Sequence, residues 1–171
     1  GEMHALAAGV GDLKRVLINV KTRGIWGEVQ LGTLLEQILA PEQYQANVAT
    51  ACGRGERVEY AVLLPGREEE GVGVWLPIDA KFPLEDYQRL VEAQERGDAQ
   101  AAELAARALE ARVRACARDI SEKYLDPPHT TDFGVMFLPT EGLYAEVLRR
   151  PGLAESLQQT SRVLVTGPTT L

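Results

Sequence analysis

The chain has 171 residues, 45% of them hydrophobic, and a formal net charge of -7. This length and composition predict one domain with a buried core. No stretch approaches the roughly 20 apolar residues that cross a bilayer, and the opening residues, Gly1 to His4, lack signal-peptide character, so we expect a soluble, cytoplasmic protein. Two cysteines, Cys52 and Cys116, fit neither a disulfide framework nor a zinc spacing and predict small buried residues in a reducing compartment.

The negative charge argues against a general nucleic-acid binder, because such proteins neutralise phosphates with Lys and Arg. The charge is uneven, however. Residues 1–60 hold seven acids and six bases, whereas residues 61–171 hold eighteen acids and twelve bases. Carboxylates that face a bound cation would also add to the count without repelling DNA. The charge therefore weakens the case for nucleic-acid binding but does not exclude such binding.

The first third of the chain predicts two helices. Apolar residues at steps of three and four indicate a helix over about 6–22, interrupted at Gly24, and a second helix from about Trp26 to just before Pro41. In the second helix Glu28 lies close in angle to Leu31 and Leu35, which predicts that Glu28 faces inward.

Strands follow in the middle of the chain. A short strand is expected over 48–52, and two alternating runs, 57–64 and 73–81, flank a polar turn and predict an antiparallel hairpin. If Leu64 opposes Val74, Glu59 opposes Asp79 on one face, whereas a slip of one residue would separate them. Pro77 cannot donate to a ladder, which predicts a bulge or an edge strand there.

The last half predicts a helical hairpin over about 83–124, in which an apolar stripe marks the packing face of the second helix. A buried strand is expected over 133–138, then short helices over 141–149 and 152–160, and a strand over 162–165. Helices mixed with strands in this way predict a single α/β domain, with a central mixed sheet covered on both faces. The stripe consists of Leu104, Ala108, Ala111, Ala115 and Ile120.

The most informative motif closes the second run of the hairpin. Asp79 and Lys81 are two residues apart on a strand and therefore project from one face. Together with a second carboxylate, such a pair supplies oxygen ligands for a divalent cation and a positive charge beside an attacking water, which phosphodiester hydrolysis requires. From spacing alone, an ordinary same-face ion pair is the better explanation of Asp79 and Lys81, because exposed pairs are common.

Four segments of the chain, including this motif, together resemble a known protein family. The Trp26-Gly27-Glu28 segment, the Ile78 to Lys81 box, the run from Asp132 to Pro139 and the closing Gly167 to Leu171 segment together resemble the RmuC family of DNA recombination proteins over nearly the whole chain. The resemblance implies a fold similar to that of PD-(D/E)xK nucleases, the restriction-endonuclease-like core. It also implies a nuclease that acts in DNA recombination and limits rearrangement at inverted repeats.

Carried over by position, the resemblance places the family's carboxylates at Glu28, Glu59 and Asp79 and its lysine at Lys81. It implies that the three acids hold Mg²⁺ or Mn²⁺, with the Ala80 carbonyl as a further ligand. Lys81 would orient or deprotonate the attacking water and steady the charge on phosphorus. The chain departs from the family at Glu59, where an Asp after Arg-Pro is usual. The resemblance also implies an N-terminal membrane anchor, a coiled coil and a C-terminal extension, which we do not expect within these 171 residues, so any membrane contact is expected from those regions.

DNA is the expected partner, and the helices offer a surface for homo-oligomers. A phosphate-contacting patch is predicted from basic residues around Trp26, whose ring could stack on an unpaired base. No glycine-rich phosphate loop is present, so we expect no small-molecule cofactor. His4 and His129 have no partner spacing for zinc and are expected at the surface. The patch consists of Lys14, Lys21, Arg23, Trp26, Arg54 and Arg57.

Two readings from other classes stay open. The chain could be a non-catalytic module that binds nucleic acid or protein on the same scaffold, which the altered Arg57-Val58-Glu59 and the acidic balance favour. It could also be a structural assembly domain whose long helices pair between subunits. Glu59 in particular could be a solvent-facing strand residue, and Glu28 a carboxylate favoured by the helix dipole.

Overall fold

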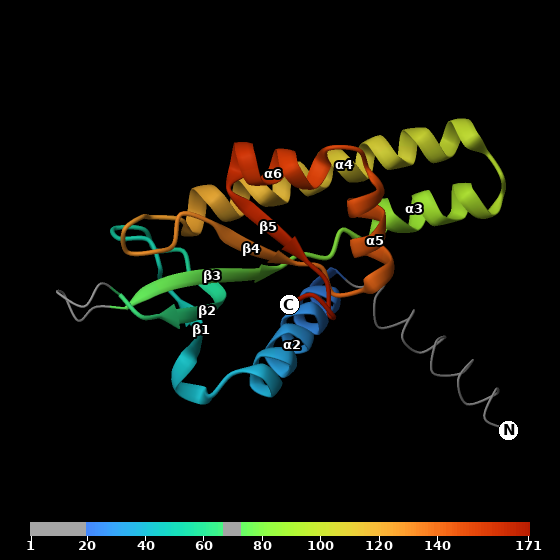
Figure 1. Ribbon diagram of the computed structural model, residues 1–171. Helices are drawn as coiled ribbons and strands as arrows, with labels where there is room; N and C mark the ends of the chain where they lie inside the picture. Colours follow the sequence, from blue (N-terminus) through green and yellow to red (C-terminus); the bar gives the residue numbers. More distant parts are fainter. Residues whose placement is uncertain (1–19, 67–72) are drawn as a thin grey trace, which may run out of the picture.

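The computed structural model describes residues 20–66 and 73–171, and these form a five-stranded mixed sheet with five α-helices (Figure 1). The strands are β1 (Tyr44–Val48), β2 (Val58–Leu64), β3 (Val74–Ala80), β4 (Gly134–Phe137) and β5 (Val163–Thr166). The helices are α2 (Val20–Ile38), α3 (Leu84–Glu95), α4 (Ala99–Tyr124), α5 (Glu141–Arg149) and α6 (Leu153–Ser161), and a 3-10 turn, Pro41–Gln43, precedes β1. The predicted α/β class with a mixed sheet is confirmed.

The strands lie in the order of the chain. β1, β2 and β3 form an antiparallel meander, and β4 and β5 add to β3 in parallel. Leu64 pairs with Val74 and Tyr60 with Ile78, so the hairpin has the one of the two open registers that places Glu59 opposite Asp79. The register holds because the alternating apolar residues of both strands would turn to the wrong face after a slip of one residue.

The prediction at Pro77 is wrong, because β3 is an interior strand that pairs with Ala61 there without a bulge. The nitrogen of Trp75 donates to the His129 carbonyl on the β4 side, and the β3–β4 ladder begins only at Ile78. Alternate residues of a strand point their backbone groups the same way, so the Pro77 nitrogen faces the gap between these two contacts. A proline at this position therefore costs the sheet no backbone hydrogen bond.

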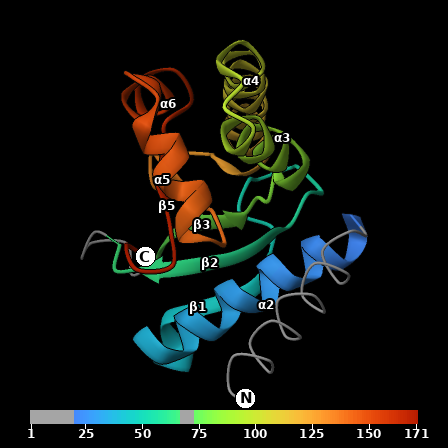
Figure 2. The same ribbon diagram turned by 90° about the vertical axis from the view of Figure 1, so that its right-hand side faces the viewer.

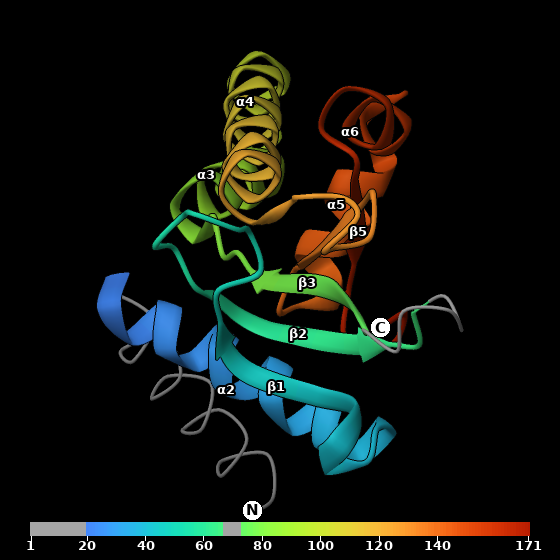
Figure 3. The same ribbon diagram turned by 90° about the vertical axis from the view of Figure 1, so that its left-hand side faces the viewer.

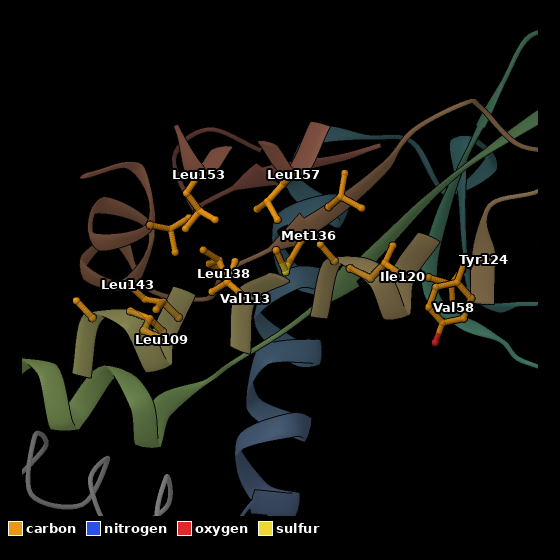
Figure 4. Close-up of a cluster of buried hydrophobic side chains, with 14 of the residues drawn as sticks. Val58, Leu109, Val113, Ile120, Tyr124, Met136, Leu138, Leu143, Leu153 and Leu157 are labelled. Carbon is orange, nitrogen blue, oxygen red and sulfur yellow. The ribbon is translucent and has the colours of Figure 1, made fainter. Parts of the chain in front are cut away.

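Helices cover both faces of the sheet, as predicted. Helix α2 crosses one face, while α3 to α6 lie on the other (Figures 2 and 3). On the α2 side, Leu31 and Leu35 pack with Ile78, Val135 and Phe137. The larger cluster on the opposite side is built from β4, α4, α5 and α6 (Figure 4) and includes Leu109, Val113, Ile120, Met136, Leu138, Leu143, Leu153 and Leu157.

The helical hairpin predicted over 83–124 is confirmed as α3 and α4, with Asp98 capping α4 by accepting a hydrogen bond from the Ala101 nitrogen at 3.0 Å. Its predicted packing stripe is wrong except at Ile120, because Leu104 is 63% exposed. The sheet selects a neighbouring face of the helix. The buried residues of α4 are Ala106, Leu109, Val113, Ala117, Ile120 and Tyr124.

Two other element predictions need correction. Helix α2 continues through Gly24, because one glycine costs a helix only about 1 kcal/mol and packing of the Leu31 face outweighs it. The strand expected over 48–52 lies earlier, at 44–48. The helix expected over 6–22 lies almost wholly outside the described residues. Within residues 20–66 and 73–171, no helix has the length and apolar character needed to cross a membrane.

Candidate functional site

Asp79 and Lys81 end β3 side by side, on the sheet face that α4 covers. The Lys81 Nζ lies 3.1 Å from Asp79 Oδ2, and the Asp79 carboxylate is buried, with 5% of its side chain exposed. Lys81 also reaches Asp119 Oδ2 of α4 at 3.1 Å. The predicted same-face pair is therefore present, and it is extended by a third charged group from a helix.

Glu59 joins this pair from β2. Its register opposite Asp79 puts the two carboxylates on the same face of neighbouring strands. The Glu59 Oε2 accepts a hydrogen bond of 3.0 Å from the Ala80 backbone nitrogen, which fixes the carboxyl group at the end of β3. Glu59 is half-buried, so it is not the solvent-facing residue of the alternative reading.

The two facing carboxyl groups resist ionisation. Burial, followed by the charge of Asp79, raises the pKa of Glu59 to about 8, although the Ala80 hydrogen bond opposes the shift. Burial also raises the pKa of Asp79, against the opposing charge of Lys81. A cation between the two groups would favour both ionised forms, because added positive charge beside a carboxyl group lowers its pKa.

Lys81 stays protonated. Burial alone would lower its pKa, but the charges of Asp79 and Asp119 and their hydrogen bonds outweigh burial and raise the pKa above its usual value. An ammonium group held in this way cannot accept a proton near neutral pH. Of the two roles predicted for Lys81, the geometry favours orienting water and stabilising negative charge over deprotonation.

Glu28 approaches from the opposite face of the sheet, on α2. A Cβ atom on Gly27 would lie 3.1 Å from Pro139 Cγ and 3.7 Å from Ala80 Cβ, so the helix passes closely over the end of β3 at this point. Glu28 itself is exposed, and its predicted inward orientation is wrong. Its charge nevertheless contributes to the raised pKa of Glu59, which places Glu28 at the rim of the carboxylate pair.

Asp119 is a member of this charged cluster that the sequence did not indicate. It bridges Lys81 and Lys123, whose Nζ lies 2.9 Å from Asp119 Oδ1, and these two lysines hold the pKa of Asp119 below its usual value. Beside this cluster a cleft of about 360 Å³ opens next to Lys81 and is lined in part by Phe82, Arg112 and Cys116. No spacing in the sequence distinguishes Asp119 from the other acids of α4.

The predicted DNA patch is only partly described. Lys14 and the side chains of Lys21 and Arg23 lie outside the described residues. Trp26 packs against Phe82, with ring centroids 5.6 Å apart, and is half-buried. Arg54 and Arg57 are exposed but donate to the carbonyls of Glu122 and Asn47 respectively.

The predicted ligands Glu28, Glu59 and Asp79 do not all have carboxylate oxygens within 4.8 Å of one another. Across the two described ranges, the one set of three His, Cys, Asp or Glu side chains whose ligand atoms all lie within 4.8 Å of one another is Cys52, Asp126 and His129. The prediction that Cys52 is buried is wrong, since Cys52 is exposed, whereas His129 lies at the surface as predicted. Both residues belong to this set. The sequence hid the set because Cys52 lies far along the chain from Asp126 and His129.

Fold and site define an α/β protein with two facing carboxylates and a lysine at the end of adjacent strands. The RmuC family model matches residues 1–171, and the chain belongs to the RmuC family. It is 56% identical over its whole length to a DNA recombination protein RmuC homolog of Xylella fastidiosa (strain Temecula1), of which it covers 38%.

More distant relatives bear the same name. A DNA recombination protein RmuC homolog of Pseudomonas aeruginosa is 30% identical, over 94% of this chain and 35% of that protein. The corresponding protein of Neisseria meningitidis serogroup B is 32% identical, over 88% of this chain and 26% of its own length. The chain thus spans well under half of the curated relatives that it matches. No solved structure matches it significantly.

Proposed function

We propose that this chain is the metal-dependent nuclease core of a DNA recombination protein and hydrolyses phosphodiester bonds of DNA. The observation that carries the proposal is the meeting of Glu59, Asp79 and Lys81 at the end of β2 and β3. Its relatives are named DNA recombination proteins, which supports a role for this chain in DNA recombination. Restriction of rearrangement at inverted repeats belongs to the same proposal.

In the proposed site, Glu59 and Asp79 hold Mg²⁺ or Mn²⁺, with the Ala80 carbonyl as a further oxygen ligand. Magnesium keeps several of its waters, so two carboxylates suffice. Glu28, at the rim, would hold a metal-bound water or a second ion. Lys81, fixed by Asp79 and Asp119, orients the attacking water and stabilises charge on the pentacovalent phosphorus.

We infer that the scaffold is restriction-endonuclease-like. An antiparallel meander carries the acids on its second and third strands, a helical pair leads to a parallel strand, and α2 brings Glu28 to the same end of the sheet. DNA would approach this end, with phosphates near Arg54, Arg57 and the start of α2. The protein acts in the cytoplasm, and any membrane contact comes from regions outside this chain.

A cleavage assay tests the proposal. Purified chain is incubated with duplex and single-stranded DNA in Mg²⁺ or Mn²⁺, beside the variants Asp79→Asn and Glu59→Gln, and circular dichroism confirms that each variant is folded. Each loss should lower the cleavage rate about 100-fold or more, because a lost ligand removes several kcal/mol of charge stabilisation. Lys123→Met, which loses only a contact to Asp119, is the matched control and should cleave normally. Cleavage that persists in Asp79→Asn contradicts the proposal.

A non-catalytic assembly module is the second candidate. Helix α2 exposes 52% of Ile25 and 59% of Val29. These apolar side chains lie one turn apart on the helix, and such an exposed pair suits contact with another protein surface. The ionisation-resistant Glu59 also fits a scaffold without a bound ion. On this alternative the chain binds DNA or protein, or pairs with copies of itself, without hydrolysis.

A further inference from the structure

Cys52, Asp126 and His129 bring a sulfur, an oxygen and a nitrogen donor together at the side of the molecule where two loops meet. Cys52 comes from the loop between β1 and β2, while Asp126 and His129 come from the loop between α4 and β4. One ligand atom from each lies within 4.8 Å of the other two. We propose that these three side chains form a zinc site, separate from the carboxylate pair on β2 and β3 and independent of the proposed nuclease function.

The donor set suits zinc better than magnesium. Zinc binds thiolate sulfur at about 2.3 Å and imidazole nitrogen or carboxylate oxygen at about 2.0–2.2 Å, usually with four ligands in a tetrahedron. Magnesium prefers oxygen and avoids thiolate. Ligand atoms within 4.8 Å of one another need only small side-chain rotations to reach a common ion. Cys52 and His129 are exposed, so water can take the fourth position.

The backbone already holds all three ligands in place. The Cys52 nitrogen donates to Asp126 Oδ2 at 2.8 Å, which leaves the second carboxylate oxygen for the ion. The His129 nitrogen donates to the Asp126 carbonyl at 2.9 Å, and the His129 carbonyl accepts from the Trp75 nitrogen of β3 at 3.1 Å. Metal binding would therefore have to order only the Cys52 and His129 side chains and not the backbone, which favours affinity.

Neighbouring contacts join the loop before β2 to the end of α4 and brace the loop that follows α4. The buried Thr50 hydroxyl donates to the Tyr124 carbonyl at 2.8 Å, and Arg54 donates to the Glu122 carbonyl. The Thr130 hydroxyl accepts from the Asp126 nitrogen at 2.8 Å. The zinc would thus clamp the loop that precedes β2 to the loop that follows α4. Its expected role is structural, with an exchangeable water on the ion.

Cobalt titration of the full chain under a non-thiol reductant tests the site. Co²⁺ bound to a thiolate absorbs through a sulfur-to-metal charge-transfer band, and added Zn²⁺ should displace it. We expect one equivalent of Co²⁺ with this band in the wild type and in the controls Cys116→Ser and His4→Gln. Cys52→Ser should abolish the band, and His129→Gln should weaken Zn²⁺ binding about 100-fold, because loss of a direct ligand costs at least as much as loss of an outer-sphere partner.

One further variant and a competition with Mg²⁺ separate this site from the carboxylate pair. Asp79→Asn should bind Co²⁺ with the same band, and a large excess of Mg²⁺ should leave the band unchanged. Circular dichroism confirms that Cys52→Ser and His129→Gln remain folded, as expected for exposed loop positions. Equal Zn²⁺ affinity in the wild type and these two variants overturns the inference, as does the absence of a charge-transfer band in the wild type. Either result leaves the nuclease proposal untouched.

Discussion

Glu59 shows how burial sets the chemistry of a single side chain in this protein. Its carboxyl group accepts the Ala80 N–H and lies opposite Asp79, yet it gains no cationic partner as close as the one Lys81 gives Asp79. A pKa of about 8 means that the metal-free protein keeps Glu59 mostly protonated at neutral pH. Binding of a divalent cation should therefore release a proton and tighten as pH rises towards 8.

Glu59 should also make the metal-free protein less stable as pH rises. Its folded-state pKa of about 8 lies above the ordinary value of 4.5, so the folded state binds more protons between these values. The resulting stability is fully present below about pH 4.5 and is lost as pH rises through 8. We expect Glu59→Gln to lose this part of the pH dependence and to exceed the wild type in stability at pH 9. Urea unfolding in EDTA at pH 5, 7 and 9 measures it, and parallel pH profiles of the two proteins would contradict the assignment.

Lys81 should be the residue whose loss destabilises the site most. In Lys81→Met, the buried Asp79 loses its ionic partner, and a buried charge without a partner costs about 3 kcal/mol. The loss should shrink as pH falls, because Asp79 can then be protonated. Lys123→Met is the matched control, since Lys123 is 43% exposed and its ion pair contributes less than about 1 kcal/mol. Equal losses in the two variants at pH 7 would show that Lys81 holds no buried charge.

At the scale of secondary structure elements, the packing of α2 over the end of β3 positions Glu28. Gly27 permits this approach, because a larger side chain there would press on Pro139 and Ala80. Gly24 lies in the same helix, and no atom of the described residues lies within 4 Å of its Cβ position. The two glycines therefore form a matched pair for testing whether close approach of the helix matters.

We expect Gly27→Val to destabilise the chain by about 1–3 kcal/mol, the usual cost of overpacking. Gly24→Val should change stability by less than about 0.5 kcal/mol, because valine is no worse than glycine in an exposed helix. Thermal unfolding compares them. A Gly27→Val protein as stable as Gly24→Val would mean that α2 is free to shift from β3.

Local patterns predicted the elements well where a single strong signal existed. Alternation in β2 and β3 predicted the antiparallel hairpin but allowed two registers, of which the structure has the one that pairs Glu59 with Asp79. The prediction failed where tertiary contacts decide. Packing carried α2 through Gly24, and the sheet selected a face of α4 other than the Leu104 stripe.

In the candidate sites too, the sequence predicted residues that lie within one element but not residues brought together by tertiary contacts. The spacing of Asp79 and Lys81 was visible in one strand, whereas Asp119 reaches Lys81 from a helix remote in sequence. Cys52 and His129 likewise meet only through the folding of two loops. Periodicity within one element carries no information about such encounters, so a single sequence could not reveal them.

For the whole molecule, net charge and exposed apolar surface affect different kinds of partner. A net charge of -7 repels DNA unless cations occupy the carboxylate site, whereas the Ile25 and Val29 surface favours contact with another protein surface. Salt distinguishes the two kinds of contact. Phosphate contacts weaken steeply with ionic strength, while an apolar helix interface does not.

If the chain assembles through α2, light scattering should give the same oligomeric mass at low and high salt, and Val29→Glu should reduce that mass. Glu36→Gln, at another exposed position of α2, is the control and should leave it unchanged. A monomer at all salt concentrations excludes self-assembly of this chain and removes one support for the assembly candidate. Oligomers that dissociate in salt would indicate a charged interface instead.

A crystal structure of the chain soaked in Mn²⁺ at pH 8.5 tests the central claim most directly. The proposed nuclease site predicts an anomalous peak between the carboxylates of Glu59 and Asp79, at about 2.0–2.3 Å from an oxygen of each. The same soak of Asp79→Asn should lose the peak. Ordered carboxylates in the wild type with no manganese between them would contradict the account, as would manganese found solely at Cys52, Asp126 and His129.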